Sequence, residues 1–147
     1  MTAPRILAYE LAVPVRWADM DVNAHVNNVQ FFTYFECARL AWLEEVRTRS
    51  ARNRQGGVVK QAACNYLRPI PYPETVRVQL YAGPPGRTSF TTYYDVISQS
   101  DPTIKYGDGH AVMVWVDRAS GKPQPLPDYV RSVLAPPASE KTMHHRK

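Results

Sequence analysis

The sequence predicts an α+β fold, in which an antiparallel sheet of about five strands wraps one long helix. The first observation behind this prediction is that residues 29–46 contain neither glycine nor proline and are rich in apolar side chains. The second is that turns rich in proline and glycine divide the chain beyond residue 57 into segments with strand character. No internal repeat or linker interrupts this order. We therefore expect one domain over residues 1–135, followed by a basic tail over residues 136–147.

The first strand is expected over Ile6 to Arg16, where Pro14 indicates an edge or a bulged strand. The strands beyond the helix are expected over Val58–Leu67, Thr75–Leu80, Thr88–Ser98 and Ile104–Val116, with a short helix over Asp128–Leu134. The segment from Ala111 to Val116 is apolar at every position, whereas a half-buried strand is apolar at alternate positions. This pattern predicts that both of its faces are covered, one of them by a second subunit.

The long helix is expected over Val29 to Val46, and it is apolar on nearly every side. Its broad apolar face carries Val29, Phe32, Phe35, Leu40 and Leu43, and further apolar residues follow at Phe31, Ala38 and Trp42. We therefore expect other structure to enclose it. Asn27 is the predicted N-cap, and Gln30 can complete a capping box with it.

The formal charge of +5 raises the question of a nucleic-acid partner. The basic residues cluster over Arg47 to Arg54 and over Lys141 to Lys147, and neither cluster is interleaved with aromatic residues as a base-stacking surface would be. A solvated helix end and a solvated terminus explain both clusters, and a groove for an anionic small molecule is the alternative. We expect no nucleic-acid partner.

No apolar run approaches the ~20 residues that span a bilayer, and residues 1–10 contain no signal-peptide core. These observations predict a cytoplasmic protein without a membrane partner. Cys37 and Cys64 lie in apolar segments, which favours buried reduced thiols over a disulfide.

The connection between the first strand and the helix, WADMDVNAHVNN over residues 17–28, concentrates polar side chains. Asp19, Asp21 and Asn23 match the first ligands of an EF-hand loop, but Ala24 and Gln30 stand where that loop requires glycine and glutamate. The calcium loop is therefore excluded.

Zinc is excluded by a similar argument, because His25 and His110 are the only histidines outside the tail and no cysteine lies near either with ligand spacing. Neither a metal nor another cofactor is expected.

A carboxylate is the best candidate for catalysis in this stretch. The sequence has no Gly-x-Ser-x-Gly elbow, and Cys37 lies within the helix pattern, where apolar neighbours would raise its pKa. Asp21, in contrast, precedes the helix, whose free N–H groups can polarise a carbonyl oxygen. This combination suits the hydrolysis of an acyl group.

The motif Asp19-x-Asp21-x-x-x-His25-Val-Asn27-Asn28 and the helix residues after it resemble a known family of enzymes. Those helix residues are Phe31, Tyr34, Phe35, Glu36, Ala38 and Arg39. Together they resemble the signature of the hotdog-fold acyl-CoA thioesterases of the 4-hydroxybenzoyl-CoA thioesterase and YbgC-like family. The resemblance extends over residues 13–117 and includes YLRPI at 66–70, GRTSF at 86–90 and AVMVWVD at 111–117.

This resemblance implies a curved sheet around the helix, a homodimer or homotetramer with active sites between protomers, and an acyl-CoA substrate. The family's catalytic carboxylate corresponds to Asp21, as nucleophile or general base, and its carbonyl-polarising backbone amide corresponds to Asn28. The chain has Asn27 and Asn28 where the aryl-CoA enzyme has aromatic residues, which leaves the acyl group open. The candidate substrate-binding residues are His25, Asn27, Tyr66, Arg68 and Arg87, the two arginines for the phosphates of coenzyme A.

Several alternatives remain at this stage. Asp19 can simply pair with Arg16, and Glu36 on the helix, with Arg39 as its partner, is the second candidate for the catalytic carboxylate. The substrate can be a thioester of an acyl carrier protein instead of coenzyme A. A non-catalytic hotdog module that binds acyl-CoA is the remaining alternative.

Overall fold

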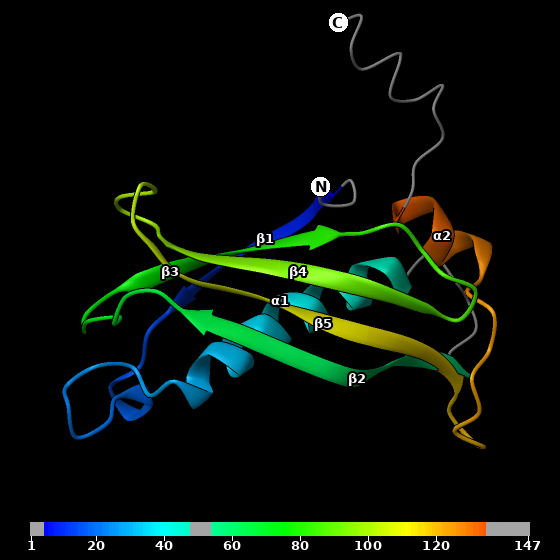
Figure 1. Ribbon diagram of the computed structural model, residues 1–147, viewed down its shortest axis with the longest axis horizontal. Coiled ribbons are helices and arrows are strands. Elements are labelled where there is room, and N and C mark those ends of the chain that lie inside the picture. The colour runs from blue at the N-terminus through cyan, green and yellow to red at the C-terminus, as the bar shows by residue number, and fades with distance from the viewer. Residues whose placement is uncertain (1–4, 48–53, 135–147) are drawn as a thin grey trace, which may run out of the picture.

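The computed structural model describes residues 5–47 and 54–134, which form one sheet, one long helix and two short helices (Figure 1). The strands are β1 (Ile6–Pro14), β2 (Gln55–Tyr66), β3 (Thr75–Ala82), β4 (Ser89–Ser98) and β5 (Lys105–Asp117), and the helices are the 3-10 helix η1 (Trp17–Asp19), α1 (Val29–Arg47) and α2 (Asp128–Leu134). The predicted α+β class is confirmed, and η1 is the one named element that the sequence did not indicate. The predicted tail and most of the Arg47 to Arg54 cluster lie outside the described residues.

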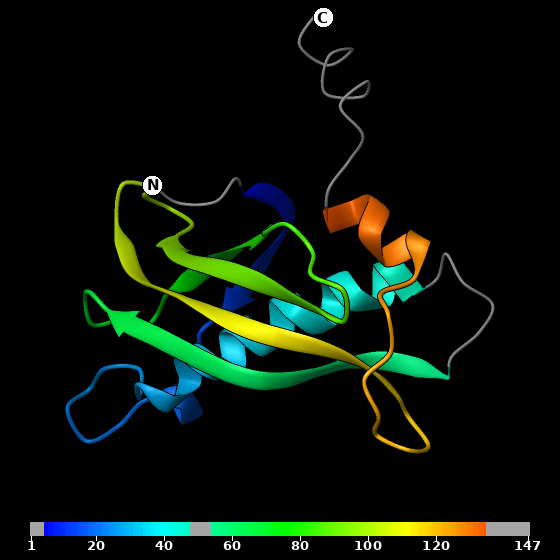
Figure 2. The same ribbon diagram turned by 45° about the vertical axis from the view of Figure 1, so that its right-hand side comes forward.

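The five strands form a single sheet in the order β1-β3-β4-β5-β2, and every neighbouring pair is antiparallel. The sheet curves around α1, which lies across one of its faces (Figures 1 and 2). β1 and β2 are the two edges, so the edge position predicted from Pro14 is confirmed. Within the described chain, the outer edge of β2 therefore has no strand beside it.

Helix α1 has a buried face and an exposed face, which differs from the prediction of a fully enclosed helix. The buried face packs into the core through Phe31, Tyr34, Phe35, Ala38, Trp42 and Val46. On the other side, Val29 is 63% exposed and Leu40 is 58% exposed. The prediction of enclosure is wrong for the single chain, because the sheet curves around only one side of the helix.

The strands facing α1 alternate between buried and half-buried residues, most regularly in β3 and β4. β5 follows the same alternation at Ala111, Met113 and Trp115, which are buried in the core, while Val112 and Val114 between them are half-buried. The continuous apolar run thus reflects a core face and an apolar outer face, and the described chain only partly covers the outer one.

Two glycines of β5 allow α1 to approach the sheet closely. A Cβ at Gly107 would lie 2.8 Å from the Phe31 ring, and a Cβ at Gly109 would overlap the Phe35 ring and a backbone oxygen of β2. Phe35 also stacks on Tyr94 of β4, with ring centroids 4.5 Å apart. The N-terminal half of α1 is therefore held against the sheet at the end where β2 finishes.

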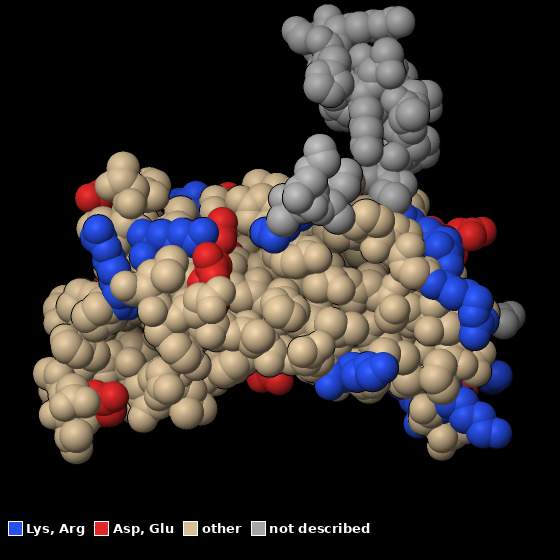
Figure 3. Space-filling view, in the orientation of Figure 1, with Lys and Arg blue, Asp and Glu red and all other residues tan. Residues whose placement is uncertain are grey.

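The charged side chains do not form a continuous basic stripe on the face of the sheet shown in Figure 3. Lysine and arginine side chains lie in small groups toward its two ends and its margins, and a broad uncharged surface separates these groups. None of the described helices is long and apolar enough to cross a bilayer.

Candidate active site

The polar stretch over residues 17–28 folds into η1 and a compact loop that leads into α1. Met20 and Val26 form an isolated antiparallel bridge, and the N–H of Asp21 donates to the backbone oxygen of His25 at 2.9 Å. Ala24 has a φ of 59°, in the left-handed region that this tight turn requires. These contacts close the loop on itself and fix the position of Asp21 relative to the start of α1.

Asp19 anchors this loop to the protein core. It is 1% exposed, and its carboxylate accepts hydrogen bonds from the backbone N–H and guanidinium of Arg16 and, at 2.9 Å, from the hydroxyl of Tyr34 on α1. Burial alone would raise the pKa of Asp19, but the donors of Arg16 and Tyr34 hold it below its usual value. The predicted pairing of Asp19 with Arg16 is confirmed, with a closest distance of 2.7 Å.

Asp21, two residues later, is half-buried and much less engaged. Its Oδ1 accepts the N–H of Asn23 at 2.9 Å in an Asx turn. This is the one side-chain hydrogen bond of Asp21 within the described residues. A carboxylate can accept about four hydrogen bonds, so Asp21 retains most of its capacity for a substrate or a water molecule.

Helix α1 begins beside this carboxylate. Asn27 is its N-cap, as predicted, because the Asn27 Oδ1 accepts the N–H of Val29 at 3.0 Å. The return bond from Gln30 that would complete a capping box is absent from the described residues. Within the same part of the chain, the N–H of Asn28 donates to no acceptor. The positive end of the helix dipole and a free donor therefore lie at Asn28.

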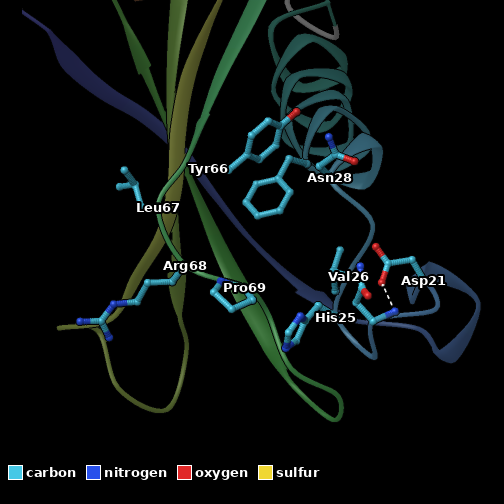
Figure 4. Close-up of a pocket in the computed structure, with 10 residues that line it drawn as sticks. Asp21, His25, Val26, Asn28, Tyr66, Leu67, Arg68 and Pro69 are labelled. Atoms are coloured by element: carbon cyan, nitrogen blue, oxygen red, sulfur yellow. Dashed lines mark hydrogen bonds between the residues drawn. The ribbon is translucent and has the colours of Figure 1, made fainter.

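A cleft of about 320 Å³ lies between this loop and the segment that follows β2 (Figure 4). Its lining includes Asp21, His25, Asn28, Phe31, Tyr66 and Arg68. The loop and the first turn of α1 provide one wall, and the segment from Tyr66 to Pro69 provides the other. A carboxylate and a helix N-terminus thus share a cleft with apolar and aromatic groups.

Tyr66 forms the inner part of the second wall. Its ring meets that of Phe31 edge-on, with centroids 5.1 Å apart, and desolvation together with Cys64 raises the pKa of its phenol. The backbone N–H groups of Leu67 and Arg68 both donate to the oxygen of Tyr106, at 2.9 and 3.0 Å. The Arg68 side chain extends away from the centre of the cleft, so its guanidinium lies at the rim (Figure 4).

The structure brings most, but not all, of the predicted site residues together. Asp21, His25, Asn28, Tyr66 and Arg68 line the cleft, whereas Asn27 supports it as the helix cap.

Arg87 does not reach the cleft of its own chain. It precedes β4, whose first residue Ser89 pairs with Val114, whereas Tyr66 pairs with Gly107 at the opposite end of β5. The exposed Arg87 therefore lies at the other end of the sheet, where its backbone oxygen accepts a hydrogen bond from Arg131.

The sequence did not identify Phe31, Leu67 and Pro69 as lining residues. Phe31 was assigned only to the helix, although it lies one turn after Asn28, and this spacing places both on one helix face. Leu67 and Pro69 flank Arg68, and no local signal distinguishes a cleft wall from a turn there.

Glu36, the second candidate carboxylate, is exposed and lines a different groove, between α1 and β2. Its predicted partner Arg39 instead donates to the hydroxyl of Tyr94 at 3.1 Å, and no ion pair links Glu36 and Arg39 within the described residues. That predicted pairing is therefore wrong for the single chain.

Among the described residues no group of three or more histidine, cysteine, aspartate or glutamate side chains is placed to hold a metal ion. Cys37 and Cys64 are free and half-buried, and desolvation raises the pKa of the Cys64 thiol to about 11.

Comparison with known proteins relates this cleft to one superfamily. The family model of the thioesterase-like superfamily matches residues 15–134, a range that contains every residue lining the cleft. YsmA of Bacillus subtilis (strain 168), an uncharacterized protein, is 32% identical over 111 residues, which cover 75% of this chain and 74% of YsmA.

Solved structures show the same likeness. The PA2801 protein of Pseudomonas aeruginosa, provisionally assigned as a thioesterase, is 40% identical with a TM-score of 0.82, and the match covers 88% of this chain and 100% of that one. The XC229 protein of Xanthomonas campestris, provisionally assigned as an acyl-CoA thioesterase, is 32% identical with a TM-score of 0.71, and the match covers 82% and 98% of the two chains.

Proposed function

The chain belongs to the thioesterase-like superfamily and is a thioester hydrolase with the hotdog fold; we propose that its substrate is an acyl-CoA and that Asp21 and the start of α1 carry the reaction. One observation supports this assignment above the others. A half-buried carboxylate and the N–H of Asn28, which has no acceptor among the residues that the structure describes, line the same cleft. Hydrolysis of a thioester requires these two functions, a nucleophile or base and a donor for the developing oxyanion.

In the proposed reaction the carbonyl oxygen of the thioester accepts the N–H of Asn28. The helix dipole adds to this polarisation, because negative charge develops on that oxygen in the transition state. Either the Asp21 carboxylate attacks the carbonyl carbon, expels the thiolate of coenzyme A and forms an anhydride that water then hydrolyses, or it takes a proton from water as the water attacks. Both routes end in the free acid and the thiol of coenzyme A.

The remaining residues of the cleft have supporting roles in this proposal. Tyr66 and His25 contact the acyl or pantetheine portion of the substrate, and Asn27 keeps the helix start in place. Arg68, exposed at the rim, binds the phosphates of coenzyme A, since a guanidinium matches phosphate geometry. Arg87 can do so only in the cleft of a partner subunit. The cytoplasmic location stays a prediction.

Replacement of Asp21 by asparagine tests the proposed catalytic role. We expect kcat to fall at least ~100-fold with little change in acyl-CoA binding, because the substitution removes the base or nucleophile and keeps the shape of the side chain. Asp101→Asn is the matched control, since Asp101 also accepts a backbone N–H in an exposed Asx turn, at 3.1 Å from Thr103. Near-normal turnover of Asp21→Asn, with loss of turnover in Glu36→Gln, would show that the wrong carboxylate has been assigned.

A substrate panel with the same acyl groups on coenzyme A and on acyl carrier protein tests the substrate class. Preference for coenzyme A supports the proposal, and preference for the carrier protein replaces it with the alternative hydrolase. Binding of acyl-CoA without turnover of any thioester, in wild type and Asp21→Asn alike, would identify a binding module.

A further inference from the structure

The proposed reaction uses the backbone N–H of Asn28 and leaves its side chain without a role. The helix does not need this side chain, because Asn27 caps α1. Asn28 is exposed in the cleft, and its amide lies between the Tyr66 hydroxyl and the Asp21 carboxylate (Figure 4). A polar group in this position, with no part in the helix cap, indicates a function in the cleft.

The Tyr66 hydroxyl determines which end of the Asn28 amide faces the cleft. Desolvation and the Cys64 thiol raise the pKa of Tyr66, whereas the Asn28 side chain lowers it, as a hydrogen-bond donor does. The Asn28 Nδ2 is therefore directed to the Tyr66 oxygen, in agreement with its place in Figure 4. The ring of Tyr66 is itself held edge-on by Phe31, with centroids 5.1 Å apart. With its nitrogen engaged, the amide turns its Oδ1 away from Tyr66, toward the Asp21 side of the cleft (Figure 4).

Two acceptor oxygens thus face the same space. The Asp21 Oδ1 accepts the N–H of Asn23 at 2.9 Å, and the other carboxylate oxygen points toward Asn28 (Figure 4). Within the described residues neither this oxygen nor the Asn28 Oδ1 accepts a hydrogen bond. Two acceptors cannot bond to each other, but they match the two O–H groups of one water molecule.

We propose that the Asn28 Oδ1 and this second oxygen of Asp21 together hold the attacking water, and that Tyr66 is the positioning residue that orients the Asn28 amide. The inference rests on the proposed function of the cleft and selects one of its two routes, in which Asp21 is a general base. The backbone N–H of Asn28 then serves the carbonyl oxygen, and its side chain serves the water.

The way Asp21 is held favours this route over direct attack. Its N–H donates to the backbone oxygen of His25 at 2.9 Å, and its Oδ1 accepts the N–H of Asn23, so backbone and carboxylate are both fixed. A nucleophilic carboxylate has to advance to bonding distance of the carbonyl carbon, whereas a general base acts from hydrogen-bond distance. A carboxylate held in this way acts more readily through a water molecule than by forming the bond itself.

The step balances with water as its only co-reactant. An O–H bond of the water breaks, the proton passes to Asp21, and the water oxygen bonds to the carbonyl carbon. The electron pair of the C=O bond moves onto the carbonyl oxygen, which accepts the N–H of Asn28. When this pair returns, the C–S bond breaks and the thiolate of coenzyme A takes the proton from Asp21. The products are the free acid and the thiol, and Asp21 is ionised again.

Replacement of Asn28 by alanine tests the role of its side chain, because the variant keeps the backbone N–H. With the acyl-CoA that wild type hydrolyses fastest, we expect kcat to fall about 10- to 100-fold and KM to stay within about twofold, since a misplaced water slows the reaction without weakening binding. Asn65→Ala is the matched control and should turn over as wild type does. Asn65 is also an exposed asparagine, but its amide donates to Asp108 at 2.9 Å, outside the cleft.

Two measurements distinguish attack by water from an anhydride intermediate. In a single turnover in oxygen-18 water, with wild type in excess over substrate, the acid should carry the label. An unlabelled acid would show that its new oxygen came from Asp21, which would overturn the inference. Asn28→Ala should release thiol and acid at the same rate, and a burst of thiol equal to the enzyme concentration would reveal an accumulated anhydride and refute the water route. The labelling experiment uses wild type and does not depend on the folding of a variant.

A double-mutant cycle tests Tyr66 as the positioning residue. Tyr66→Phe keeps the ring against Phe31 and removes the hydroxyl, so kcat should fall about threefold to tenfold, the scale of one hydrogen bond, with KM unchanged. In the Asn28→Ala background the same substitution should have no further effect on kcat, because the amide that Tyr66 orients is then absent. Tyr81→Phe removes the hydroxyl that donates to Gln79 and is the control, with wild-type kcat expected. Additive losses in the double variant would refute the positioning role.

These tests separate a failure of this inference from a failure of the proposed function. Unchanged kcat in Asn28→Ala, with Asp21→Asn inactive, would overturn the role of the Asn28 side chain and leave Asp21 as the catalytic carboxylate. Normal turnover of Asp21→Asn would instead remove the proposed function, and this inference with it.

Discussion

Substitution of Asp19 by asparagine should destabilise the protein although Asp19 takes no part in the proposed reaction. The Asp19 carboxylate accepts three hydrogen bonds from Arg16 and one from the buried hydroxyl of Tyr34. An asparagine keeps one acceptor oxygen but turns an NH2 group toward these donors. Loss of a charge-assisted bond, together with one buried donor left unsatisfied, costs about 2–4 kcal/mol. The exposed Arg16 side chain adds little to this, because solvent screens its charge.

The loss is measurable as a shift in Tm of roughly 6–12 °C, at about 3 °C per kcal/mol for a chain of this size. Thermal unfolding should be followed at a fixed protein concentration, since Tm depends on concentration wherever copies of a chain associate. Asp101→Asn, which changes an exposed carboxylate, is the control and should melt near the wild-type temperature.

The pH dependence of thermal stability distinguishes the contribution of the Asp19 charge from the contribution of the shape of its side chain. The pKa of Asp19 is lowered in the folded protein, so its stabilisation is complete above the unfolded value of 3.8 and is lost as pH falls through the lower folded value. The difference in Tm between wild type and Asp19→Asn should therefore be largest at neutral pH and shrink below about pH 4. A difference that is small at neutral pH, or that stays constant into acid, would refute this account of Asp19.

Two further predictions concern the cleft rim and the helix–sheet contact. Arg68→Ala should raise KM for acyl-CoA more than it lowers kcat, and increasing salt should raise the wild-type KM in the same direction, because ions screen exposed phosphate contacts beyond about 10 Å at 0.1 M. An unchanged KM in Arg68→Ala, or a salt-independent wild-type KM, would count against the assignment. Gly109→Ala should lower the free energy of unfolding in urea by about 1–3 kcal/mol or more, because its Cβ would overlap the Phe35 ring and a β2 oxygen. Gly121→Ala, at an exposed turn with φ 73°, should cost only about 1 kcal/mol, and equal losses for the two would contradict the close-packing argument.

The order of the elements was predictable because it depends on local periodicity. Val76, Val78 and Leu80 alternate with polar residues, and the strand they predict is β3, whose alternate residues are buried. The helix predicted from the absence of glycine and proline is α1, and the predicted cap Asn27 accepts the N–H of Val29. In each case the element depends on residues that lie close to one another along the chain, so a local sequence pattern is enough to predict it.

Which face of α1 is buried was less predictable. Apolar residues lie on nearly every side of this helix, so the sequence pattern does not indicate which side the sheet covers. Phe31 and Phe32 are adjacent and equally apolar, yet Phe31 is 3% exposed and Phe32 is 36% exposed. The choice depends on Gly107, because the space its missing side chain leaves receives the Phe31 ring. Arg87 was misplaced for a related reason: its distance from the cleft follows from strand register, which is a property of pairs of distant segments.

The two aspartates of the motif have different roles because their surroundings differ. Asp19 is buried with four donors around it, so its oxygens are occupied and its lowered pKa makes it a poor base. Asp21 accepts the single N–H of Asn23 and lines the cleft. The N–H of Asn27 donates to the backbone oxygen of Asp19 at 2.8 Å, and the hydroxyl of Tyr34 on α1 reaches the Asp19 carboxylate, so Asp19 ties both ends of the loop to the helix. Asp21 can therefore remain free for a substrate because Asp19 supplies the contacts that hold the loop in place.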